Sequence, residues 1–69
     1  MQHQRLVALI GEEEAAKILG LAVQTLRNWR FKRIGPAYLK VGSRSVRYSP
    51  EDLQNWIEGQ KIQPEAEAA

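Results

Sequence analysis

The sequence predicts a small, mainly helical domain with one β-hairpin, in the order helix, turn, helix, hairpin, helix. Two stretches with helical periodicity flank a glycine, and two short alternating runs flank a glycine-containing turn. A start signal for a third helix follows. The chain has 69 residues, and a domain of this size buries only about 60% of the surface that its unfolded chain exposes. We therefore expect every large apolar residue to serve the core.

The first helix is expected to begin after Gly11, which takes the capping position, and to stop at Gly20, which tolerates a positive φ. It opens with Glu12, Glu13 and Glu14, and carboxylates in a first turn suit the positive end of the helix dipole. A metal or catalytic role for them is disfavoured, because consecutive helix residues point in different directions. The expected buried stripe has three members: Ala15, Ala16 and Leu19.

Helical periodicity resumes for a second helix over residues 22–33, and Gly35-Pro36 ends it. A helical wheel divides this segment into two flanks. The apolar flank carries Val23, Leu26 and Trp29, with the stems of Arg30 and Arg33. The opposite flank carries Gln24, Asn28 and Phe31, with Thr25 and Arg27 at its edges. Two helices joined by a glycine-containing turn indicate a helix-turn-helix.

Residues 38–41 and 45–48 alternate with period two around a short turn, which predicts a β-hairpin. Ser49 then has the character of an N-cap, Pro50 that of a first helical residue, and Asp52 occupies the N3 place of a capping box. The apolar residues of this last helix are Leu53, Trp56 and Ile57. The complete order is that of a winged helix-turn-helix, with the hairpin as the wing.

The last helix is expected to stop near Gly59, so the chain divides into three parts. We expect an N-terminal arm over 1–8, the winged helix-turn-helix domain over 9–59, and a disordered acidic tail over 60–69. Ile62 is the only large apolar residue of the tail, so nothing there offsets the entropy of ordering.

Composition excludes several classes of function. There is no cysteine, and the single histidine, His3, is expected to be solvated in a frayed terminus, so neither a disulfide nor a metal site is expected. The longest apolar run, Leu6–Ile10, is far shorter than the roughly 20 residues that a membrane span needs, and it lacks the layout of a signal peptide. No side chain has a suitable partner for catalysis. We expect a cytoplasmic protein with no enzymatic activity, no metal and no cofactor.

Charge is segregated along the chain. Eight basic side chains and no acidic one lie between Lys17 and Pro50, and all eight carboxylates lie outside that window. One electropositive body results, which favours binding to phosphates.

The second helix has the properties of a DNA-recognition helix: an apolar flank, short polar side chains opposite to it, and no acid in its own sequence. The amides of Gln24 and Asn28 can bridge adenine N6 and N7, and Arg27 can reach guanine O6 and N7. Thr25 can meet a thymine methyl group or a phosphate. The alternative is that Gln24 and Asn28 are ordinary solvated positions.

Five other side chains of the domain are expected to pack. Arg30 and Arg33 are interpreted as packing stems whose heads reach nearby phosphates. Phe31 is expected to pack beneath the wing, the alternative being contact with a base step or a thymine methyl group. Trp29 and Trp56 are expected in the core rather than stacked on bases.

The tip and outer face of the hairpin are expected to display Lys40, Arg44 and Arg47. Beside a recognition helix, these cations favour a wing that clamps phosphates or the minor groove. The alternative is that the arginines are edge charges that discourage aggregation.

A succession of motifs from Leu9 to Ile57 resembles the excisionase-type, MerR-like helix-turn-helix family, which includes AlpA-type phage regulators and recombination directionality factors. The motifs are Glu13-Glu14-Ala15-Ala16, Leu19-Gly20-Leu21, Thr25-Leu26, Asn28-Trp29-Arg30, Gly35-Pro36, Val46-Arg47-Tyr48 and Asp52-Leu53 with Trp56. The resemblance implies a recognition helix in the major groove and a wing along the backbone or minor groove. The resemblance also implies a function as a transcription regulator, or as an architectural factor that bends DNA for an integrase.

Carried over by position, the resemblance assigns DNA contacts to Gln24, Thr25, Arg27, Asn28, Arg44 and Arg47. Two positions depart from the family pattern. Ala22 stands where relatives commonly have Ser or Thr, which removes a capping hydroxyl worth about 1 kcal/mol. Arg27 stands where relatives vary.

The leading hypothesis is sequence-specific binding of double-stranded DNA by a small phage or mobile-element regulator or an excisionase-like factor. The alternatives are a DNA-packaging subunit similar to small terminase subunits and a protein-interaction adaptor. A recombinase or RNA polymerase is a candidate partner. The chain lacks a long coiled-coil helix, so we expect a monomer in solution that assembles cooperatively on DNA.

Overall fold

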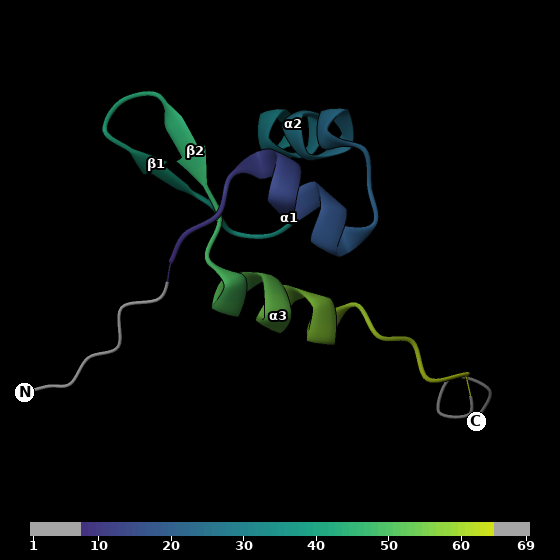
Figure 1. Cartoon of the computed structure of the whole chain (residues 1–69). Helices are drawn as coiled ribbons and strands as arrows, with labels where there is room; N and C mark the ends of the chain where they lie inside the picture. The colour runs from purple at the N-terminus through teal and green to yellow at the C-terminus, as the bar shows by residue number, and fades with distance from the viewer. Residues whose placement is uncertain (1–7, 65–69) are drawn as a thin grey trace, which may run out of the picture.

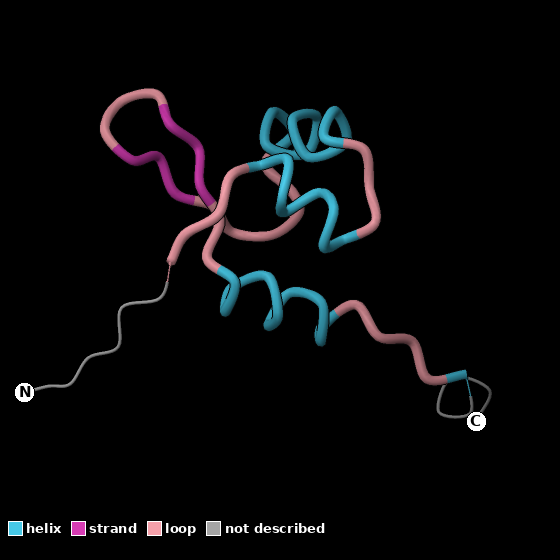
Figure 2. The backbone as a smooth tube through the Cα atoms, in the orientation of Figure 1, coloured by secondary structure: helices cyan, strands magenta, loops and turns pink. Residues whose placement is uncertain are grey.

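The computed structural model describes residues 8–64, which contain three helices and one two-stranded sheet. Figures 1 and 2 show their order along the chain. The predicted fold, mainly helical with a hairpin and consistent with a winged helix-turn-helix, is confirmed. The elements are α1 (Glu12–Leu19), α2 (Val23–Lys32), β1 (Leu39–Val41), β2 (Ser45–Arg47) and α3 (Pro50–Gly59).

The first helix lies at the centre of the domain. In Figure 1, α2 lies on one side of α1, α3 lies on the other, and the hairpin projects from the end at which α1 begins. A short β-bridge joins Ile10 to Tyr48, and each backbone N–H donates to the other residue's carbonyl, at 2.9 and 2.8 Å. This bridge ties the base of the hairpin to the segment that leads into α1.

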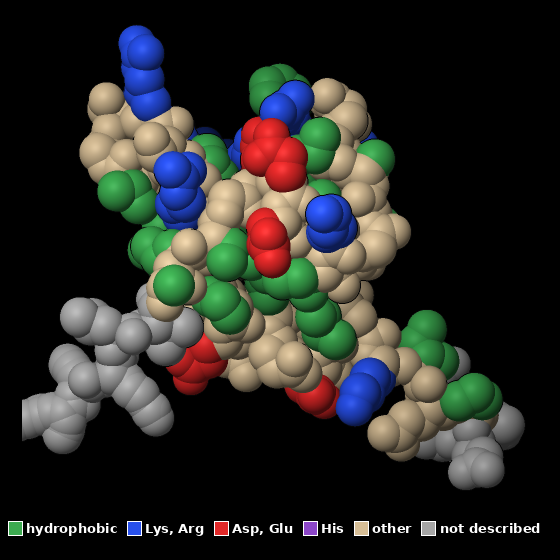
Figure 3. Space-filling model, viewed as in Figure 1, with side chains coloured by type: hydrophobic (Ala, Val, Ile, Leu, Met, Phe, Trp, Pro, Cys, Tyr) green, Lys and Arg blue, Asp and Glu red, His purple; other side chains and the backbone are tan. Residues whose placement is uncertain are grey.

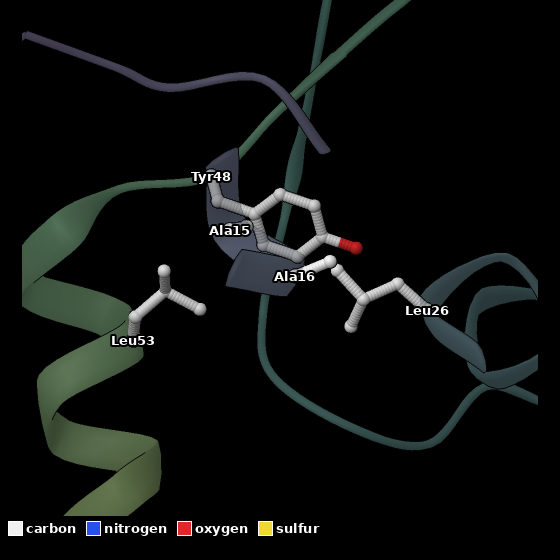
Figure 4. Packing of buried hydrophobic residues seen from close by; sticks show 5 residues of the cluster. All are labelled: Ala15, Ala16, Leu26, Tyr48 and Leu53. Carbon is white, nitrogen blue, oxygen red and sulfur yellow. The ribbon is translucent and has the colours of Figure 1, made fainter. Parts of the chain in front are cut away.

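The core draws on all three helices and on the end of the hairpin. Its members are Ala15, Ala16, Leu26, Tyr48 and Leu53. Each is at most 3% exposed, and Tyr48 is the largest of the fully buried side chains. Figure 4 shows the Tyr48 ring over the two alanines of α1, between the leucines of α2 and α3. Because alanine has only a methyl group, the ring can approach the α1 backbone closely.

The predicted helix signals act as expected at the N-termini of the three helices and at the end of α1. Gly11 caps α1, and Gly20 ends it with a left-handed φ of 72°. Ala22 caps α2 without a side-chain hydrogen bond, as the missing hydroxyl requires. At α3 the backbone N–H of Asp52 donates to the Ser49 hydroxyl at 3.3 Å, so the serine half of the capping box forms.

The two tryptophans pack on each other. The ring centroids of Trp29 in α2 and Trp56 in α3 are 5.5 Å apart, with a tilt of 51° between the rings. Gly35 lies directly against Trp29, because a Cβ at this glycine would come within 2.6 Å of the indole Cε3 atom. Trp29 packs against the core, as predicted. Gly35 therefore does more than end a helix: its lack of a side chain makes room for the indole.

The second helix ends at Lys32, one residue earlier than the segment predicted from periodicity. Arg33 follows in the left-handed conformation, with φ 62° and ψ 42°, and its N–H donates to the Arg30 carbonyl at 3.1 Å. Within residues 8–64 it is the only residue other than glycine with a positive φ. Because the helix has already ended, Arg33 is exposed, and the prediction that its stem packs on the apolar flank is wrong.

The expectation that every large apolar residue serves the core is also wrong. Within the predicted domain, Phe31 is 89% exposed, Ile34 is 54% exposed and Ile18 is 50% exposed. Three short helices and a two-stranded hairpin enclose a single small core, so side chains on their outer surfaces have no apolar layer to cover them.

Some predictions lie wholly or partly outside the described residues. These concern the N-terminal arm with His3 and Leu6, and the end of the tail. Residues 60–64 are described and are exposed. None of the helices within residues 8–64 has the length and hydropathy needed to cross a membrane.

Replacing Arg33 with glycine is expected to stabilise the domain. A left-handed conformation costs a residue with a Cβ roughly 1–2 kcal/mol, part of which glycine loses again through its greater freedom in the unfolded chain. We expect a gain of about 1 kcal/mol, or a rise of about 4–8 °C in Tm. Thermal unfolding followed by circular dichroism measures this.

Lys32→Gly is the matched control, because it removes the same charge from the neighbouring residue, which is still helical. It should lower stability by up to about 1 kcal/mol. Equal shifts for the two variants would show that the backbone conformation of Arg33 is not the cause.

Candidate nucleic-acid interface

The exposed flank of α2 carries the side chains that the sequence predicts as readers of bases. Gln24, Arg27 and Asn28 are exposed, and Thr25 is half-buried. The Gln24 Nε2 donates to the Asn28 Oδ1 at 3.1 Å, one helical turn away. The two amides therefore form one polar unit in the free protein, and a bidentate contact of either amide with adenine requires this bond to open or rearrange.

Glu12, the first residue of α1, binds two arginines of α2. Its Oε2 accepts hydrogen bonds from Arg27 Nε at 3.1 Å and Arg27 Nη2 at 2.7 Å, and its Oε1 accepts one from Arg30 Nη2 at 3.0 Å. The second helix has no acid in its own sequence, yet the fold brings one against it. The α1–α2 packing joins Glu12 to arginines that lie 15 and 18 positions away along the chain.

This ion cluster changes the proton affinities of its members. The hydrogen bonds from Arg27 lower the pKa of Glu12, partial burial acts against that change, and the bond from Arg30 reinforces it. The bond to Glu12 raises the pKa of Arg27. Burial acts to lower the pKa of Arg30, but its bonds to Tyr48 and Glu12 outweigh that effect and raise it. All three groups are therefore charged at neutral pH.

Arg30 is held inside the domain. Its Nη1 donates to the Tyr48 hydroxyl at 3.1 Å, and its guanidinium carbon lies 5.7 Å from the centroid of the Tyr38 ring. Only 17% of its side chain is exposed. The predicted packing of its stem is confirmed, and its head is occupied by Glu12 and Tyr48 in the free protein.

The hairpin presents its cations on different faces. The register pairs Leu39 with Arg47 and Lys40 with Val46, and directly paired residues share a face of a sheet. Lys40 thus shares a face with Val46, which packs against the core, while Arg47 lies on the opposite face. The prediction of one outer face carrying both cations is wrong, because the register separates them. Both side chains are nevertheless exposed.

Arg44 is exposed in the turn between the strands, and the Arg47 Nη1 donates to the Val46 carbonyl at 2.8 Å. A hollow of about 350 Å³ separates the wing from the helices. Figure 3 shows basic side chains over the hairpin and acidic ones nearby over the beginning of α1. Acidic and basic side chains both line this hollow. They are Glu12, Glu13, Arg30, Arg44 and Arg47.

Phe31 does not pack beneath the wing. It is 89% exposed at the end of α2 and lines an open hollow with Ile34 and Tyr38. Phe31 lies on a different side of α2 from the core residue Leu26, so no core side chain covers its ring. The prediction of packing is wrong, and the alternative of a contact with DNA stays open.

Two residues that matter here were not identified from the sequence. In the sequence, Glu12 is recognisable only as a carboxylate at the start of a helix. Its pairing with arginines of α2 depends on how α1 and α2 pack. Tyr48 has the position of a strand residue in an alternating run, which does not reveal that its ring enters the core and its hydroxyl meets Arg30.

Glu12→Gln is expected to destabilise the domain at neutral pH by at most about 1 kcal/mol, since the ion pairs are partly solvated. A carboxylate whose folded-state pKa is lowered contributes stability above its unfolded pKa, and this contribution disappears as the pH falls through the folded-state pKa. The difference between variant and wild type should therefore shrink below about pH 4. Urea unfolding at pH 7 and at pH 3 tests this expectation.

Glu14→Gln is the control for that measurement, because Glu14 is an exposed carboxylate of the same turn. Its effect should be small at both pH values. A difference between Glu12→Gln and wild type that is the same at both pH values would contradict the role given to the carboxylate charge.

Comparison with known protein families supports the helix-turn-helix arrangement of α1 and α2. A family model described as a helix-turn-helix domain matches residues 10–61, which span all five elements. Among curated proteins and among solved structures, no significant match was found. The family match supports a DNA-binding protein and agrees with the motifs that resemble excisionase-type members. The chain therefore belongs to the helix-turn-helix domain family.

Proposed function

We propose that this protein binds double-stranded DNA in a sequence-specific manner, as a small transcription regulator of a phage or mobile element or as an excisionase-like architectural factor. The observation that carries the proposal is the helix-turn-helix itself. Figure 1 shows that α1 lies between α2 and α3 and that the hairpin projects away from α3. The proposal includes no catalytic step and no cofactor. Binding to chromosomal or phage DNA would give the protein a cytoplasmic location.

In this proposal α2 lies in the major groove. Gln24 and Asn28 contact adenine edges, Arg27 contacts a guanine, and Thr25 contacts a thymine methyl group or a phosphate. The exposure of the first three side chains supports this assignment. Thr25 is half-buried and therefore reaches only a group close to the helix surface.

The wing supplies contacts that position the protein. Arg44 at the turn and Arg47 on the face away from the core suit contacts with phosphates or the minor groove. Lys40 is exposed on the face of the hairpin opposite to that of Arg47, and it suits a phosphate contact. The three side chains thus extend from different parts of the wing and are not expected to contribute equally.

One module of this size buries only about 600–1,000 Å² on DNA, so useful affinity requires neighbouring copies or repeated sites. We propose a monomer in solution that assembles cooperatively on DNA. A recombinase or RNA polymerase would be recruited from that assembly.

The second candidate function is a protein-interaction adaptor. It is favoured by the exposed apolar side chains at the end of α2, Phe31 and Ile34, which line the same open hollow as Tyr38. Arg27→Glu separates the two functions, because it should abolish DNA binding and leave the binding of a protein partner intact.

Binding to DNA is expected to depend strongly on salt. One module that contacts about 4–6 phosphates should give a slope of about −4 to −5 in a plot of log K against log salt concentration. Selection of bound duplexes from a random pool, followed by titration of the selected duplex at several salt concentrations, provides the slope. A slope near zero, or no retardation of any duplex at low salt, would refute the proposed function.

Substitutions in α2 and in the hairpin should affect DNA binding in different ways. Asn28→Ala should weaken binding to the selected duplex by about 1–3 kcal/mol and relax the preference at one base pair, whereas Arg44→Ala should weaken binding to all duplexes and reduce the salt slope by about 1. Lys61→Ala is the charge-matched control, because Lys61 is paired with Glu58 and follows α3. If Lys61→Ala reduces the slope as much as Arg44→Ala does, the wing has no special role.

A further inference from the structure

We propose that Glu12 is a positioning residue for base recognition: it holds one edge of the Arg27 guanidinium and directs the other edge to a guanine. This inference rests on the proposed function and concerns how one of its base contacts is selected. It gives Glu12, an acidic residue outside the acid-free segment Lys17–Pro50, a role in distinguishing one base pair from others.

The hydrogen bonds between the two residues occupy one side of the guanidinium. The Nε and Nη2 groups of Arg27 both donate to the Glu12 Oε2, at 3.1 and 2.7 Å. A guanidinium has five N–H donors in a rigid plane. The pair of donors at its far end, one on each Nη atom, remains for another acceptor, and such a pair matches O6 and N7 of guanine.

Glu12 is itself fixed by a chain of contacts that begins in the core. Its Oε1 accepts from Arg30 at 3.0 Å, and Arg30 donates to the hydroxyl of Tyr48 at 3.1 Å. Tyr48 is only 1% exposed. The carboxylate is thereby held on a buried anchor, and Arg27 is held on the carboxylate.

Exposure rises along this chain in the direction of the proposed DNA. The exposed fraction of the side chain is 17% for Arg30, 19% for Glu12 and 45% for Arg27. Only the last member is open enough to meet a ligand. Because its guanidinium is already oriented, Arg27 loses less conformational freedom on meeting a guanine than an unrestrained arginine would.

The Glu12 carboxylate also weakens binding to DNA sequences that do not offer the guanine contact. It lies beside two arginines, so it cancels part of the charge that would attract phosphates at any sequence. A repulsive group that acts against the wrong ligand contributes to specificity, which is a difference between two affinities. Glu12 should therefore lower affinity for arbitrary DNA and raise the preference for the correct site.

The test compares the full-length wild type with Glu12→Gln and with the control Glu14→Gln. Each protein is used to select duplexes from a random pool, and each is then titrated with the wild-type site and with a scrambled duplex at one salt concentration. For Glu12→Gln we expect the ratio of the two affinities to fall about tenfold, which corresponds to the loss of one well-oriented bidentate contact. The loss should be confined to one base pair, and affinity for the scrambled duplex should rise about two- to threefold.

Arg27→Lys provides a second route if Glu12→Gln is poorly folded. Lysine keeps the charge but lacks the planar fork, so it should lose the preference at the same base pair. Agreement between the two variants on that base pair supports positioning, because a purely structural effect of Glu12 would weaken binding to all sequences alike.

Three results would overturn the inference while leaving the proposed function intact. The first is a Glu12→Gln profile identical to that of wild type. The second is an equal change for Glu12→Gln and Glu14→Gln, which would indicate bulk charge alone. The third is a loss of preference at different base pairs for Glu12→Gln and Arg27→Lys. A wild-type protein that binds no duplex would instead overturn the proposed function, and the inference with it.

Discussion

The burial of Tyr48 is the interaction on which the other parts of the domain depend. The residue directly follows β2, and its ring lies between side chains of all three helices (Figure 4). Its backbone pairs with Ile10 ahead of α1, and its hydroxyl accepts a hydrogen bond from Arg30 of α2. One side chain thus sets the position of the wing relative to the helix pair. Among residues 8–64 the buried hydrophobic cluster has five members, and Tyr48 is the largest of them.

The ion cluster beside this core couples stability to the candidate interface. A single carboxylate, Glu12, satisfies two arginines, and the polar end of the buried tyrosine satisfies part of one of them. Arrangements of this kind contribute little to stability when they are solvated, but they limit the orientations of long side chains. The cluster therefore matters more for where Arg27 points than for how firmly the domain folds.

The surface of the domain combines charge with exposed apolar side chains. Phe31 and Ile34 extend from the end of α2, next to a residue in a left-handed conformation, Arg33. That conformation turns the chain away from the helix axis and leads it toward Gly35, whose missing side chain makes room for Trp29. Phe31 is accessible because its flank of α2 faces away from the core, whereas Ile34 lies in the segment that follows Arg33 outside the helix.

The sequence by itself determined the order of the elements, their approximate bounds and most of the caps, because these features depend on local interactions. Gly20, Ser49 and the alternating runs around residues 42–44 act within a few residues of themselves. It also indicated which flank of α2 is exposed, since helical periodicity separates apolar from polar side chains. Only the tertiary structure decided which distant side chains meet. The pairing of Glu12 with Arg27, the burial of Tyr48, the exposure of Phe31 and the separation of Lys40 from Arg47 follow from helix packing and strand register. Those are set by the combined geometry of several elements, which no local stretch of sequence contains.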